Sequence, residues 1–187
     1  TADALRRAGK LGPVVPRLAQ RLQGQATYRL QTSVAPLAQG GRSDWQLASN
    51  LQGMAIDLPA PLGKAAEPAL PLRLSSAPEV RANGGPAVGP ARDALRLDLG
   101  ALKAALLMDH GAPGGSRLLR SAWSWDAPLP EVTPGGRAVL VLGRVDADAW
   151  RNALAPPAVA ASSAGAAAAA AADDLAWLPQ SLQLQAT

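Results

Sequence analysis

The sequence predicts a mainly β fold: a long, curved antiparallel sheet, open as a groove or partly closed as a sandwich, with one or two short helices. Two observations support this prediction. Apolar and polar residues alternate through six or more segments, which is the pattern of strands with one buried and one solvated face. Apolar residues recur at helical spacing in only two short segments, 13–22 and 146–154.

The first strand is predicted in residues 25–34, "QATYRLQTSV". Tyr28 and Leu30 lie on one side of an extended chain, and polar residues lie on the other. Pro36 and the glycine pair at 40–41 then predict a turn into the next strand.

The second predicted strand covers residues 44–58 and changes face within its length. Before Gly53 the apolar residues, such as Trp45, lie at odd positions; after it they lie at even positions, such as Ile56. An inserted residue is needed to bring both sets onto one surface, so we expect a β-bulge near Gln52–Gly53. A strand of this length spans about 50 Å and belongs in a strongly curved sheet.

Five later segments are also predicted as strands: 69–76, 93–100, 117–125, 137–143 and 181–186. In "RLLRSAWSW" the spacing aligns Leu119, Trp123 and Trp125. The segment "ALKAALLMD", 101–109, fits either a helix or a strand; we favour a strand because Gly100 makes it the return arm of a hairpin.

The organisation predicted from these patterns has four parts: a lead-in with a short helix over 1–24, the sheet body over 25–157, an Ala-rich loop over 158–174 and a terminal strand over 175–187. A second short helix begins after Asp146, which is expected to cap it. The chain has no initiator Met, so we expect it to be an internal fragment of a longer protein.

The composition excludes several classes of function. The net charge of +4 is compatible with a protein that binds nucleic acid. However, the basic residues are scattered along solvated strand faces and no aromatics interleave with them, so no nucleic-acid partner is expected. The absence of cysteine removes disulfides and thiolate chemistry.

No constellation of catalytic residues is evident, so we expect neither an enzyme nor a bound metal or cofactor. His110 is the only histidine and lies in a turn beside Asp109. Asp57 points to the polar side of its strand, and Asp146 and Asp148 are explained by helix capping and the helix dipole.

The apolar strand face therefore carries the functional prediction. Leaving 400 Å² of such surface bare would cost about 10 kcal/mol, and two short helices do not cover it. The apolar face must therefore be covered by curling of the sheet, by another domain or by a ligand. Two alternatives follow: a sandwich with a filled core, or a groove that binds acyl chains. The candidate groove lining, taken from strand parity, is Tyr28, Leu30, Trp45, Leu47, Leu51, Met54, Ile56, Leu58, Leu72 and Leu74.

Two segments carry a family resemblance. "DWQLASNLQGMAIDLPAPLGKAAEPALPLRL" resembles a W-x-L-x-S-x-L-x-G-x-x-I-x-L-P-x-P-L-x-K motif, followed by P-L-x-L, of AsmA-like proteins of the YhdP type in Gram-negative bacteria. "VLGRVDADAWRNAL" is similar to that family's D-x-D-x-W segment, with Asp146, Asp148 and Trp150 in place. The Ala-rich tract, 158–172, has no counterpart in the family pattern.

The resemblance implies a periplasmic segment of an inner-membrane-anchored protein, with the anchor outside this chain. Its β-rich body would resemble chorein-type and TamB-like bridges that carry phospholipid towards the outer membrane in a hydrophobic groove. The implied partners are phospholipid acyl chains and neighbouring segments of the same longer chain. A non-catalytic structural or assembly module of the cell envelope is the alternative.

Overall fold

The computed structural model describes residues 20–34, 43–79, 92–111, 116–154 and 179–186. More than half of these residues lie in strands, so the prediction of a mainly β fold is confirmed. Contacts divide the chain into two units: unit 1 holds Thr1–Thr27, Leu51–Ala69 and Gly143–Ala176, and unit 2 holds Tyr28–Asn50, Leu70–Leu142 and Trp177–Thr187.

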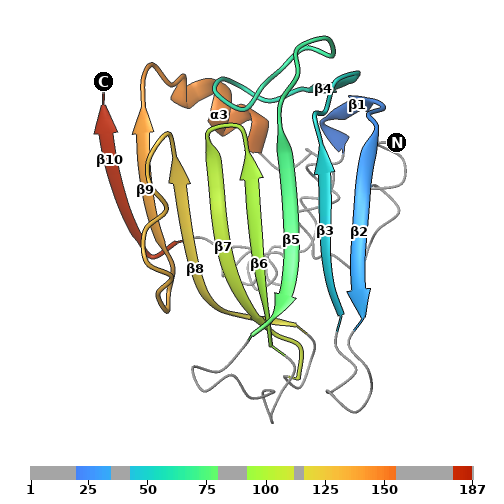
Figure 1. The fold of residues 1–187 in the computed structure, drawn as a ribbon. Helices are drawn as coiled ribbons and strands as arrows, with labels where there is room; N and C mark the ends of the chain where they lie inside the picture. The colour runs from blue at the N-terminus through green and yellow to red at the C-terminus, as the bar shows by residue number, and fades with distance from the viewer. Residues whose placement is uncertain (1–19, 35–42, 80–91, 112–115, 155–178, 187) are drawn as a thin grey trace, which may run out of the picture. The chain divides into compact units, whose positions relative to one another are not determined.

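Unit 2 contains one open, eight-stranded sheet in the order β10-β9-β8-β7-β6-β5-β3-β2 (Figure 1). Because the sheet is open, β2 and β10 form its two edges. Its strands are β2 (Tyr28–Val34), β3 (Ser43–Ser49), β5 (Leu72–Pro78), β6 (Arg92–Leu99), β7 (Leu102–Asp109), β8 (Arg117–Trp125), β9 (Arg137–Leu142) and β10 (Ser181–Ala186).

The sheet is antiparallel from β2 to β8 and parallel from β8 to β10. Parallel neighbours cannot be joined by a tight turn, so the chain returns along the sheet before β9 begins. On that return, Thr133 forms an isolated bridge with Ser121 of β8. The segment 181–186, predicted as a strand in need of a partner, finds it in β9.

The ambiguous segment 101–109 is a strand. β6 and β7 form a hairpin around Gly100, whose positive φ of 57° favours glycine. The N–H of Gly100 donates to the carbonyl oxygen of Pro71 at 3.0 Å, which ties the hairpin to the start of β5.

A β-bulge does occur in the sheet, but in β8. Leu107 of β7 faces Arg120, whereas Met108 faces Leu118, so Leu119 is the extra residue. Leu119, predicted to align with the two β8 tryptophans, is thus the residue at which the alternation along β8 is interrupted, and Leu118 takes the paired position opposite Met108.

The predicted strand over 44–58 is also wrong, because it ends at Ser49. Leu51 adopts a φ of 48° and Gly53 a φ of 89°, so the chain turns there instead of forming a bulge. The following residues form β4 (Met54–Ile56), which belongs to unit 1 and pairs antiparallel with β1 (Leu22–Gly24).

Unit 1 also holds the helix α3 (Ala147–Leu154). Its predicted cap is confirmed, since Asp146 Oδ1 accepts a hydrogen bond from the N–H of Ala149 at 2.9 Å. The helix predicted over 13–22 falls mostly outside the described residues, and Leu22 at its end lies in β1. The Ala-rich tract also lies outside them.

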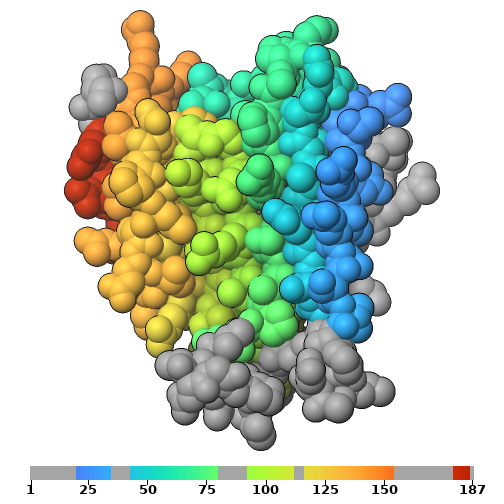
Figure 2. Space-filling model, viewed as in Figure 1, coloured from blue at the N-terminus to red at the C-terminus, as the bar shows by residue number. Residues whose placement is uncertain are grey.

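No helix in the described ranges is long and apolar enough to span a bilayer. Figure 2 shows one side of the eight-stranded sheet, on which the side chains of neighbouring strands form a continuous layer from β2 to β10.

Candidate functional site: the apolar face of the sheet

Strand register defines an apolar face that crosses all eight strands of unit 2. Residues directly opposite one another on paired strands have side chains on the same side of a sheet. The register connects one apolar residue from each strand into a row: Leu30, Leu47, Leu74, Leu97, Ala104, Trp123, Ala138 and Leu182. This set, with the residues in phase with it, is called the apolar face below.

A neighbouring row on the same face is apolar over most of its length. From β5 to β10 it contains Leu72, Leu99, Leu102, Trp125, Leu140 and Leu184. On the other side of the first row, Ser76 and Ser121 are buried polar positions, so the apolar character is strongest towards the end of the sheet that carries Leu72.

Exposure differs between the edges and the centre of the apolar face. At one edge Tyr28, Leu30 and Val34 are 64%, 52% and 73% exposed, and at the other edge Leu182 and Leu184 are 56% and 62% exposed. Between the edges, Ala104 in β7 and Ala138 in β9 are buried. The centre of this face thus serves as core, whereas both edges present large apolar side chains to their surroundings.

The structure brings six of the ten predicted lining residues together on this face: Tyr28, Leu30, Trp45, Leu47, Leu72 and Leu74. The other four do not join them. Met54 and Ile56 are buried in β4 of unit 1, and Leu51 and Leu58 lie outside any strand. The cause is the turn at Leu51–Gly53, which takes the chain into a second sheet.

The predicted lining omitted the apolar face on five of its eight strands, namely β6 to β10. The same alternation was present there, in "ALRLDL" and "SLQLQ". The alternation within each strand does not reveal the order of the strands in the sheet. This order connects the separate apolar patterns into one surface.

The opposite face carries charges in complementary order. Asp98 of β6 lies directly opposite Arg73 of β5 on one side and Lys103 of β7 on the other. Opposite charges in directly facing positions stabilise a sheet by about 0.2–1 kcal/mol per pair. This alternation of signs fits a solvated surface over β5 to β7 and does not form a patch of one charge, whereas Ala105, Ala122 and Ser124 on the same face are buried.

In unit 1, the ammonium of Lys64 is held by backbone carbonyls. Its Nζ donates to the carbonyl oxygens of Leu51 at 3.0 Å, Met54 at 2.6 Å, Ala65 at 2.8 Å and Ala66 at 3.4 Å. The backbone of Lys64 also forms an isolated bridge with Ile56. Lys64, at the end of the "PLGK" segment, therefore connects the loop after β4 to the residues at the start of β4.

The two segments that carry the family resemblance meet in unit 1. The indole Nε1 of Trp150 in α3 donates to the carbonyl oxygen of Ala60 at 2.8 Å. Arg21 donates to the carbonyl oxygen of Ala153 at 3.2 Å and forms an exposed ion pair with Asp57 at 3.5 Å. Trp150 of the "DADAW" segment is thus hydrogen-bonded to the backbone of the "LPAPLG" loop.

His110 is joined to two side chains that the sequence reading did not connect with it. Its Nδ1 lies 2.7 Å from Ser116 Oγ, and its Nε2 lies 3.2 Å from Asp93 Oδ2. Asp109, the expected neighbour, instead accepts a hydrogen bond from the N–H of Gly111 at 2.8 Å. The histidine ties the beginning of β6 to the residues just before β8.

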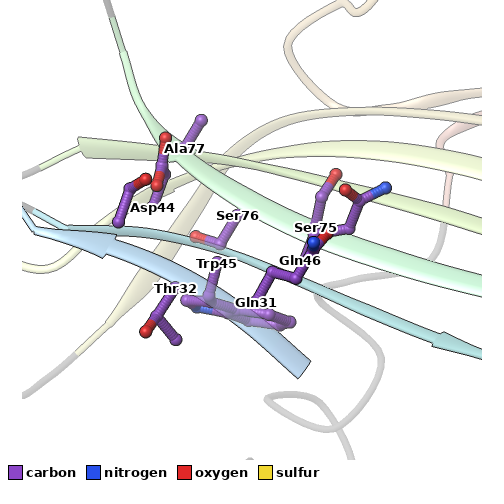
Figure 3. Close-up of a pocket in the computed structure, with 9 residues that line it drawn as sticks. Gln31, Thr32, Asp44, Trp45, Gln46, Ser75, Ser76 and Ala77 are labelled. Carbon is purple, nitrogen blue, oxygen red and sulfur yellow. The ribbon is translucent and has the colours of Figure 1, made fainter. Parts of the chain in front are cut away.

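A hollow of about 700 Å³ lies beside β2, β3 and β5 (Figure 3). Its lining includes residues of the apolar face, such as Trp45 and Ser76, and of the opposite face, such as Gln46 and Ser75. Because both faces contribute and the lining is mainly polar, this hollow does not provide an enclosed apolar site.

Among the described residues, no group of three or more His, Asp or Glu side chains is arranged to hold a metal ion. Searches of family models, curated proteins and solved structures found no match for the chain.

Proposed function

We propose that the apolar face of unit 2 binds phospholipid acyl chains, within a periplasmic protein of the AsmA-like, YhdP type that moves phospholipid between the inner and outer membranes. The protein is non-catalytic and uses no cofactor in this proposal. The observation that carries it is the apolar row from Leu30 to Leu182, which crosses every strand and ends in exposed leucines at both edges.

The dimensions of the row agree with such a role. Eight strands about 4.8 Å apart give a row of roughly 34 Å. The acyl chains of one leaflet occupy about half of a 30 Å hydrocarbon core. Each methylene that leaves water for an apolar surface contributes about 0.8 kcal/mol, so contact with the exposed apolar side chains at the edges favours retention of a chain.

The periplasmic location and the membrane anchor outside this chain rest on the resemblance alone. The residues that carry it belong in part to β3, through Trp45 and Leu47, and in part to the unit 1 loop with Lys64. Neighbouring segments of a longer chain are the further partners in this proposal.

The test compares substitutions at neighbouring positions of the two edge strands, Leu30 with Gln31 and Leu182 with Gln183. All four residues are exposed, so their substitution should affect folding least. Leu30→Asp and Leu182→Asp place a charge on the apolar face, whereas Gln31→Asp and Gln183→Asp place the same charge on the opposite face. Native mass spectrometry of the purified chain, loaded with a fluorescent phosphatidylethanolamine, measures bound lipid.

We expect lipid in the unsubstituted chain and in the two glutamine variants, and a severalfold loss in the two leucine variants. Circular dichroism checks that all four retain their strand content. Absence of lipid from the unsubstituted chain, or equal losses in both sets, contradicts the proposal.

The second candidate is a structural module of the cell envelope. The observation that favours it is the lack of charge on β10, "SLQLQA", an edge strand whose Leu182 and Leu184 are exposed. It predicts normal folding and no lipid in the same mass-spectrometric experiment.

A further inference from the structure

Among the residues that the structure describes, few of the features that usually keep sheet edges apart are found at the outer edge of β2. In the described part of the chain, β2 pairs with β3 and no strand lies along its other side. All seven residues of β2 are exposed. Natural edge strands are protected by lysine, proline or a bulge, and β2 has none of these; its one charged residue is Arg29.

The backbone groups that face outward on β2 follow from hydrogen bonds elsewhere in the sheet. The N–H of Gly100 bonds the carbonyl of Pro71, and the N–H of Glu79 bonds the carbonyl of Arg92, so odd-numbered residues of β5 point their backbone groups towards β6. Since these groups alternate along a strand, the register through β3 directs those of the even-numbered β2 residues outward.

We propose that β2 is a dimer interface, at which it pairs antiparallel with β2 of a second copy of this chain. In the register with a twofold axis at Gln31, residue 28 faces residue 34 of the other copy and residue 30 faces residue 32. These four residues are the ones with outward N–H and C=O groups, so all of these groups form hydrogen bonds in the paired state.

The side chains also match in this register. Tyr28 lies opposite Val34, an aromatic and β-branched pair of the kind that stabilises sheets, and Leu30 lies opposite Thr32. On the other face, Arg29 lies opposite Ser33, so no like charges meet. Gln31 lies opposite itself, where two amides can hydrogen-bond.

A twofold interface closes after two copies, which distinguishes it from the other edge pairing available. Pairing of β2 with β10 of a second copy is head-to-tail and leaves a free edge at each end, so it leads to open chains of copies. The twofold axis stands perpendicular to the sheet and leaves both apolar faces on one side. The dimer requires no lipid and does not depend on the proposed function.

The first experiment measures mass by light scattering coupled to gel filtration over a range of concentrations. We expect a species of twice 19.0 kDa that dissociates on dilution. Thr32→Pro removes an outward N–H without removing a β2–β3 hydrogen bond, and it should raise the dissociation constant by roughly tenfold or more. Thr32→Val keeps the N–H and should leave the dimer intact.

The second experiment tests the register by single cysteines, since the chain contains none of its own. In Gln31→Cys the two cysteines face each other with Cα atoms about 4.5 Å apart, within disulfide range. In Ser33→Cys they are roughly 13 Å apart. Oxidation should link the first variant into a covalent dimer and leave the second unlinked.

A chain that is monomeric at every concentration overturns the proposal. So does efficient linkage of Ser33→Cys, or a dimer that persists in Thr32→Pro and is lost in Leu184→Pro, because that result assigns the contact to β10.

Discussion

Units 1 and 2 are stabilised in different ways. Unit 1 depends on a few specific contacts between side chains and backbone, such as Lys64 Nζ with four carbonyls and Trp150 Nε1 with Ala60. Unit 2 depends on the repeated pairing of its eight strands. The motif residues Lys64 and Trp150 therefore make specific contacts in unit 1, whereas the surface proposed to bind lipid lies in unit 2 and is recognised mainly by the alternation of apolar and polar residues.

The largest effect is expected from Gly63→Ala. A Cβ at Gly63 would overlap the backbone carbonyl oxygen of Leu58, which cannot move aside as a flexible side chain does. We expect unit 1 to lose about 3 kcal/mol of unfolding free energy, read from hydrogen exchange in peptides containing β4. Gly143→Ala, in the same unit, meets nothing within 4 Å and should change it by less than about 0.5 kcal/mol. Equal effects would contradict this reading.

Lys64→Met should destabilise unit 1 by about 2 kcal/mol, because four carbonyl oxygens lose one shared donor. Protection from exchange at Met54–Ile56 is the measurement. Lys103→Met, on the solvated face of unit 2, removes an equal charge and should cost less than about 0.5 kcal/mol. Equal losses of stability in the two lysine variants would contradict the proposed difference between the units.

Ala122→Leu tests whether the sheet of unit 2 also contains positions with a strict size limit. Ala122 is fully buried on the face opposite the apolar face, so a larger side chain overpacks it at a cost of about 1–3 kcal/mol. Chemical denaturation followed by tryptophan fluorescence measures the loss. Ala77→Leu, at an exposed position of the same face, should be nearly neutral, and a large loss there would show that size is not the cause.

Trp150→Phe should cost unit 1 about 1 kcal/mol, since the ring remains and the hydrogen bond to Ala60 is lost. Exchange at residues 59–63 is the readout. Arg151→Ala changes an exposed residue of the same helix and serves as the control. If the two variants were equally stable, the hydrogen bond of Trp150 would not contribute to the stability of unit 1.

The smallest effect is expected from Asp98→Asn, at about 0.5 kcal/mol, because the carboxylate faces Arg73 and Lys103 on an exposed surface. The loss should shrink in 1 M salt, where such charges are screened. A loss that is unchanged by salt would point to a packing role.

The strands of unit 2 were predictable because they alternate in polarity and are separated by Gly and Pro. The helix cap at Asp146 was predictable because it depends on local sequence. The turn at Leu51–Gly53 was not, because a glycine that shifts the phase of a pattern fits a bulge as well as an exit from the sheet. The conformation of Leu51, with a φ of 48°, decides between them.

The candidate surface was predictable in part. Parity identified six residues of the apolar face correctly as neighbours, but the parallel addition of β9 and β10 could not be read from the sequence. Leu182 and Leu184 therefore became part of the same face only through strand order. The contacts of His110 with Asp93 and Ser116 join distant positions and carried no local signal.

The parallel position of β10 has a consequence for the time course of folding. β10 begins at Ser181 and pairs with β9 from Arg137 onward, whereas β6 and β7 are joined by a two-residue turn. Closing the longer loop costs more chain entropy before any contact forms. During synthesis, the edge of β9 that faces β10 thus stays unpaired until β10 has left the ribosome, and this edge is where early association between nascent chains is to be looked for.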